Sequence, residues 1–134
     1  MVDALNRAHR MVKAGGLVVD FHVSASPSPV EVGDTTTGHV ISPDAELRHA
    51  AAGVALATSV DEGLFAVEDA TTFTFYTYGN TIDELRDYIA ENWRDSRIDQ
   101  RTVDATREAL RGAPGVRPRI REEVHVTRLR PRYP

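Results

Sequence analysis

The sequence predicts a mixed α/β fold, or an α+β fold in isolation, in which about four helices pack on a small sheet. Apolar residues recur at helical spacing in four segments that carry capping or glycine signals at their ends. The longer run at 64–78 is rich in β-branched and aromatic residues, as strands are, and a last strand follows the fourth helix at 117–129. A short apolar strand follows the first helical segment, and its nearly continuous hydrophobicity is typical of a strand covered on both faces.

The first half is predicted to alternate between the two kinds of element. In order, the pattern predicts a helix at 2–12, a strand at 17–23, a loop at 24–29, a hairpin of strands 30–32 and 38–41, and a helix at 43–62. Gly15-Gly16 supplies a left-handed stop for the first helix. Ser42 and Pro43 are suited to the N-cap and first position of the long helix.

The second half is predicted to place two helices between two long strands. The ranges are a strand at 64–78, helices at 81–93 and 99–111, and a strand at 117–129. Thr81 and Glu84 have the spacing of a capping box.

The composition is that of an ordinary globular chain, with 41% hydrophobic and 27% charged residues. A length of 134 residues predicts a single domain, 1–134. The absence of cysteine excludes disulfides, thiolate nucleophiles and cysteine-based zinc sites, and makes the cytoplasm the expected compartment. No apolar run approaches the roughly 20 residues that a bilayer requires, and no signal peptide is evident, so we expect no membrane partner.

The charge distribution argues against nucleic acid as a partner. The net charge is −4, whereas phosphate binding usually needs a basic domain or face. The C-terminal run is locally basic, through arginines at positions 117, 119, 121, 128, 130 and 132. This run lacks interleaved stacking aromatics, so we interpret it as a solvated strand face with a frayed end rather than an anion site.

Residues 4–23, ALNRAHRMVKAGGLVVDFHV, resemble a segment of the class I S-adenosylmethionine-dependent methyltransferases. In that family a helix carrying A-x-R-x-L-K-P-G-G leads into the fifth strand of the sheet. The matching positions are Ala8, Arg10, Val12, Lys13, Gly15, Gly16 and Leu17, with Ala14 where the family usually has proline. The resemblance implies that this chain corresponds to the C-terminal half of such an enzyme. The expected sheet is a partial Rossmann-like sheet that contains one strand of the kind that is parallel in the family. An antiparallel pair of strands at 64–78 and 117–129 ends the fold.

The cofactor half of that family has no counterpart in this sequence. There the cofactor lies on a glycine-rich turn after the first strand, and no G-x-G-x-G pattern occurs here. We therefore assign no cofactor-binding residue and expect no cofactor for this chain alone. S-adenosylmethionine would be expected as a cofactor only if a missing N-terminal half were supplied.

The resemblance also predicts an exposed strand edge. The strand at 17–23 is interior in the family, so without its neighbour it would present unpaired amides beside apolar side chains. A homodimer across this strand, a helix folded over it, or a partner chain would each cover the edge. The homodimer ranks first because no predicted helix is left over to act as a lid.

A candidate ligand pocket is predicted beyond the strand ends, formed by Asp20, His22, Tyr76 and Tyr78. His39, His49 or His125 could approach Asp20 and His22 to complete a metal or acid–base site. The histidines lack metal-ligand spacing, so we predict a polar edge role for His22 and assign no metal site and no catalytic residue. We predict that His9 packs in the helix stripe, and that His125 lies on a solvated face.

Three functions remain open from the sequence. In the first, the chain is a methyltransferase-like domain without independent catalysis that acts by self-association or with a partner. Alternatively, it is part of a split or truncated S-adenosylmethionine-dependent methyltransferase, or it is a small-molecule binding module. The substrate is not encoded in any recognisable motif.

Overall fold

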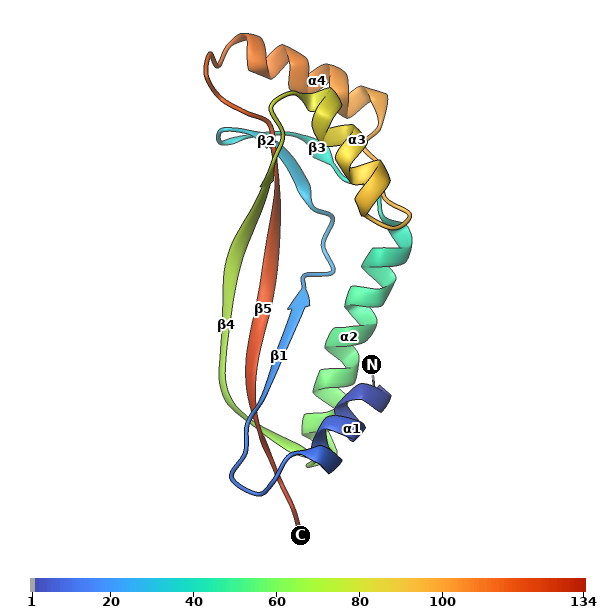
Figure 1. Ribbon diagram of the computed structural model, residues 1–134, viewed down its shortest axis with the longest axis vertical. Coiled ribbons are helices and arrows are strands. Elements are labelled where there is room, and N and C mark those ends of the chain that lie inside the picture. The colour runs from blue at the N-terminus through green and yellow to red at the C-terminus, as the bar shows by residue number, and fades with distance from the viewer. Residues whose placement is uncertain (1) are drawn as a thin grey trace. The chain divides into compact units, whose positions relative to one another are not determined.

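A computed structural model describes residues 2–134, which form four helices and an open five-stranded antiparallel sheet (Figure 1). The elements in chain order are α1 (Val2–Met11), β1 (Val18–Val23), β2 (Pro29–Val32), β3 (Thr35–His39), α2 (Pro43–Asp61), β4 (Phe65–Tyr78), α3 (Ile82–Asn92), α4 (Gln100–Arg111) and β5 (Arg119–Pro131). The predicted mixed α/β fold class is confirmed.

The described residues divide into two compact units. The first unit contains residues 2–24, 47–73 and 123–134, and the second contains residues 25–46 and 74–122. The long strands β4 and β5 each contribute residues to both units. The sequence prediction of one domain stays a prediction, and each unit is described by itself below.

In the first unit, β5 pairs with β1 and with β4, and the helices α1 and α2 lie along one face (Figure 1). The register of β1 on β5 runs from Val18 opposite Leu129 to Val23 opposite Val124. The core between helices and strands contains Leu5, Ala55, Phe65 and Leu129, with Val18, Leu56, Val60 and Leu64 packed against it. Ala55 is the small residue of α2 that packs closely on the strands in this core.

In the second unit, the β2–β3 hairpin pairs with the beginning of β5 and packs against α4. Its core contains Val30, Val40, Ile82, Leu85, Ile89, Ile98, Val103 and Ile120. Gly38 approaches α4 so closely that an added Cβ would overlap the side chain of Thr102. The neighbouring Thr37 hydroxyl lies 2.7 Å from Thr106 Oγ1, so a threonine pair also joins β3 to α4.

Most of the predicted elements are present, and the predicted antiparallel pair of β4 and β5 is confirmed. The predicted hairpin loop at 33–37 is wrong. The chain turns instead at Gly33, whose φ of +58° allows a tight turn, and Thr35 already lies in β3. The first helix ends at Met11, before the glycines, and Gly15 with φ of +81° turns the chain toward β1.

Within residues 2–134, no helix is both long and apolar enough to cross a membrane.

Candidate functional site

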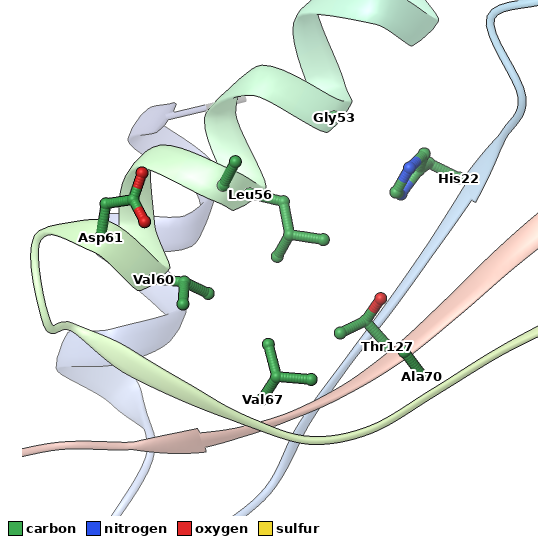
Figure 2. A pocket seen from close by; sticks show the side chains of 9 residues that line it. His22, Gly53, Leu56, Val60, Asp61, Val67, Ala70 and Thr127 are labelled. Atoms are coloured by element: carbon green, nitrogen blue, oxygen red, sulfur yellow. The ribbon is translucent and has the colours of Figure 1, made fainter.

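A cavity of about 370 Å³ opens in the first unit between α2 and the strands (Figure 2). Leu56 and Val60 point toward it from α2, and Val67 and Thr127 point toward it from the strands. Its lining residues are His22, Gly53, Leu56, Ala57, Val60, Asp61, Val67, Ala70 and Thr127. The lining is mostly aliphatic, which is typical of sites that take small apolar molecules with a few polar anchors.

The small residues of α2 leave this space. Gly53 and Ala57 face the cavity, and a Cβ added at Gly53 would meet no atom within 4 Å. Larger residues at these positions would pack against the strands, so the helix composition creates the cavity.

His22, which lines the cavity, forms a hydrogen-bonded pair with Asp20. His22 Nδ1 lies 2.5 Å from Asp20 Oδ2, and the two side chains are only 14% and 10% exposed. The strand alternation places both on the same side of β1, as the sequence predicts. A carboxylate can only accept, so Nδ1 carries the proton and Nε2 is left as the acceptor. The pair can therefore accept a proton or hydrogen bond from a polar group.

Two further histidines lie near this pair. The ring of His125, opposite His22 in the β1–β5 register, has its centroid 5.3 Å from the His22 centroid. The side chain of His125 is also 38% exposed and its Nε2 lies 3.9 Å from Glu123. Burial, with the nearby charges of Arg48 and His22, lowers the pKa of His49 below its usual value. His39 lies in the second unit.

His9 packs as the sequence predicts. Its ring makes an edge contact with Phe65 at 5.4 Å and a tilted contact with Tyr133 at 4.7 Å. Its Nε2 lies 2.7 Å from the carbonyl oxygen of Arg132, so the ring joins α1 to the C-terminal segment.

Tyr76 and Tyr78 belong to the second unit, where arginines cover their rings. The guanidinium of Arg119 lies 4.2 Å from the Tyr76 ring centroid, and that of Arg117 lies 4.9 Å from the Tyr78 centroid. Cation–π contacts of this kind stabilise the packing of a strand face. The grouping of these tyrosines with Asp20 and His22 into one pocket stays a prediction.

The basic C-terminal run makes internal ion pairs. In the second unit, the nearly buried carboxylate of Glu31 accepts from Arg119 at 3.1 Å and from Arg121 at 3.0 Å. In the first unit, Arg128 and Arg130 both contact Glu68. The hydrogen bond from Arg130 is the main cause of the lowered pKa of Glu68. These arginines therefore have structural partners.

The free edge of β1 is the second feature that bears on function. In the part of the chain that the structure describes, β1 pairs with β5 alone. The N–H of Ser24 donates to the carbonyl of Glu123 at 2.8 Å. Backbone groups alternate along an antiparallel pair, so those of Asp20 and His22 face β5, and those of Val19, Phe21 and Val23 face away from it.

The side chains beside this edge are apolar and exposed. Val19 is 43% exposed and Phe21 is 62% exposed. An edge strand with free amides and exposed apolar side chains is a template for pairing with another chain. In the described residues, the strand predicted at 17–23 is observed at 18–23, and one of its edges is unpaired.

Most of the cavity lining was not predicted from the sequence. The predicted pocket contains His22 but none of Gly53, Leu56, Val67 and Thr127, which come from three different elements. The alanine-rich inner side of α2 was the one available signal, because a helix of small residues leaves space beside a strand. Among residues 2–134, no group of three or more histidine, aspartate or glutamate side chains is arranged to hold a metal ion.

Comparisons with protein-family models, curated proteins and solved structures found no match to this chain.

Proposed function

We propose that this chain is a methyltransferase-like domain that has no catalysis of its own and acts by pairing with another polypeptide along the free edge of β1. The observation that carries the proposal is the unpaired row of outward-facing amides at Val19, Phe21 and Val23. A cytoplasmic location is part of the proposal and is supported by the absence of cysteine.

The order of elements supports the methyltransferase-like part of this proposal. The chain runs from the Gly-Gly turn at Gly15-Gly16 into β1, and its last two strands are the antiparallel neighbours β4 and β5. The resemblance of residues 4–23 implies both features. It also implies that β1 has a second neighbouring strand, which another chain would provide.

A proline at residue 21 tests the association directly. The N–H of Phe21 faces away from β5, so Phe21→Pro removes a donor from the free edge and leaves the β1–β5 hydrogen bonds intact. We expect the wild-type chain to sediment as an oligomer and Phe21→Pro to sediment as a monomer with an unchanged circular dichroism spectrum. The matched variant Phe21→Ala keeps the N–H and isolates the contribution of the side chain. Oligomers of equal stability in wild type and Phe21→Pro would refute the association.

Calorimetric titration with S-adenosylmethionine tests the absence of independent catalysis. We expect no heat of binding to this chain, because the sequence has no glycine-rich cofactor turn. Tight binding by the chain alone would overturn the proposal.

A second candidate function, small-molecule binding, is favoured by the cavity beside His22. An apolar ring with one hydroxyl would place its ring among Leu56, Val60 and Val67 and its hydroxyl on His22 Nε2. Thermal denaturation with p-cresol tests this. We expect p-cresol to raise the Tm of the wild type and not that of Gly53→Leu, whose side chain fills the cavity. Equal shifts in both proteins would place binding elsewhere.

A further inference from the structure

We propose that the polypeptide that pairs with β1 is a second copy of this chain, in the antiparallel register that places Phe21 opposite Phe21 of the second copy. This inference rests on the proposed function and specifies its partner. The resulting interface is a twofold one, in which the same strand is presented by both copies. The residues of β1 select this register in three ways.

The first selection comes from the backbone. Only Val19, Phe21 and Val23 have N–H and C=O groups that face the free edge. Centring the pair on Phe21 sets Val19 opposite Val23 of the second copy and Phe21 opposite itself. All three outward residues of β1 are then used in both copies, which gives about six hydrogen bonds. A shift of two residues in either direction leaves one of them opposite a residue outside β1.

The second selection comes from charge. In this register Asp20 lies opposite His22 of the second copy, in the closely spaced kind of pair where Cα atoms are about 4.5 Å apart. Like charges directly across two strands are destabilising. A shift toward the N-terminus sets Asp20 opposite Asp20, and a shift toward the C-terminus sets His22 opposite His22. The register centred on Phe21 therefore keeps the two Asp20 carboxylates from lying directly opposite each other.

The third selection comes from the exposed face. Val19, Phe21 and Val23 lie on the side of β1 opposite to the Asp20–His22 pair. The register sets these apolar side chains against one another, with the two Phe21 rings as neighbours across the twofold axis. Phe21 is the most exposed side chain of β1, and aromatic cross-strand pairs are among the stabilising ones. A slip of the register by one residue would place the apolar side chains of one copy opposite side chains on the other face of the second copy.

Single cysteines test the register, because the chain has no cysteine of its own. The variants Val19→Cys, Phe21→Cys and Val23→Cys are treated with a short bis-maleimide, and covalent dimer is measured by denaturing electrophoresis. We expect the fastest cross-linking at residue 21. Residues 19 and 23 are each offset from their own copies by four positions, or about 13 Å along the strand. Equal rates at 19 and 21, or at 21 and 23, would mean a shifted register and overturn the inference.

A charge-exchange experiment tests the Asp20–His22 contact between copies. His22→Glu sets glutamate opposite aspartate, so this variant alone is expected to dimerise more weakly than wild type. Asp20→Lys sets lysine opposite histidine and is its partner in the mixture. In an equimolar mixture the introduced lysine of one variant lies opposite the introduced glutamate of the other, and the remaining His22 lies opposite the remaining Asp20. We expect dimers to return in sedimentation of this mixture, because contacts within each chain do not change on mixing. A mixture that stays monomeric while both variants keep their circular dichroism spectra would overturn the inference.

The outcomes separate this inference from the function on which it rests. If Phe21→Pro abolishes association but cross-linking is not fastest at residue 21, the edge function holds and the register is wrong. If Phe21→Pro associates as the wild type does, the edge function itself is wrong. A wild-type chain that remains monomeric up to millimolar concentration overturns the self-pairing.

Discussion

Gly38 and Gly53 show how the same residue type can have opposite roles. At Gly38 an added Cβ would overlap Thr102, whereas at Gly53 it would meet no atom within 4 Å. Gly38 thus permits the close approach of β3 to α4, and Gly53 lies inside α2 without a packing requirement. The two positions provide matched substitutions.

We predict that Gly38→Ala lowers the free energy of unfolding by about 1–3 kcal/mol, through overpacking against Thr102. We predict that Gly53→Ala raises it by up to about 1 kcal/mol, because alanine favours the helical state. Urea denaturation of both variants measures the two changes. Changes of the same sign would contradict the packing described for one of these sites.

We predict that His49 contributes a pH dependence to stability. Burial lowers its pKa in the folded state, so the unfolded chain binds its proton more readily. The contribution of neutral His49 to the free energy of unfolding is therefore fully present above about pH 6.5, the pKa of histidine in the unfolded chain. It is lost as the pH falls through the lower pKa of the folded state. His49→Gln should make the free energy of unfolding vary less between pH 7 and pH 5, as measured by denaturation at several pH values. An unchanged slope would refute this assignment.

The Thr81 cap is predicted directly by the sequence, and Asp99 is a second cap that the structure adds. Thr81 Oγ1 accepts from the N–H of Glu84 at 3.1 Å, and Asp99 accepts from the N–H of Thr102 at 2.9 Å. The hydrogen bond from Thr102 also lowers the pKa of Asp99. These bonds satisfy donors that a helix end leaves free.

We predict that Thr81→Ala destabilises the chain by about 1 kcal/mol and that Thr81→Ser changes it little. The serine hydroxyl can accept the same hydrogen bond from Glu84, which makes it the control for the loss of the methyl group. Thermal denaturation of the two variants measures the difference. A serine variant as unstable as the alanine variant would show that the cap bond is not the cause.

The elements of this fold are predictable because their signals are local. Apolar spacing, with capping residues or closing glycines, located α2, α3 and α4, the β-rich run at 64–78 located β4, and β5 was expected after the last helix. The hairpin turn was misplaced because Gly33 and Gly38 both permit a turn, and only the packing of Gly38 against Thr102 shows which glycine turns the chain. The pairing of β2 with β5 depends on residues far apart in the sequence and has no local signal.

The candidate site was predictable only in part for the same reason. Alternation along β1 placed Asp20 and His22 on one face, and the structure brings them together. The cavity beside them depends on side-chain sizes in α2, β4 and β5 at once. The approach of His125 follows from the β1–β5 register, which requires knowledge of the strand order.

At the scale of the whole molecule, β4 and β5 are each continuous through both units. We therefore predict a single cooperative unfolding transition rather than two. Ile89→Ala in the second core and Leu129→Ala in the first should each lower that one transition, by about 2–5 kcal/mol, because both side chains are fully buried. Calorimetry measures this, and two separate transitions, each sensitive to one variant, would contradict it.

The place of β5 between β1 and β4 has a consequence for how the chain acquires its structure (Figure 1). The partner of Val18 is Leu129, about 110 residues later, and contacts between such distant residues slow folding. Until β5 has been synthesised, β1 has neither of its edges paired within the chain. Nascent chains thus expose an apolar strand for most of their synthesis, the condition under which chaperones are needed and chains misassemble. Refolding from denaturant should accordingly be slow and increasingly incomplete as the protein concentration rises.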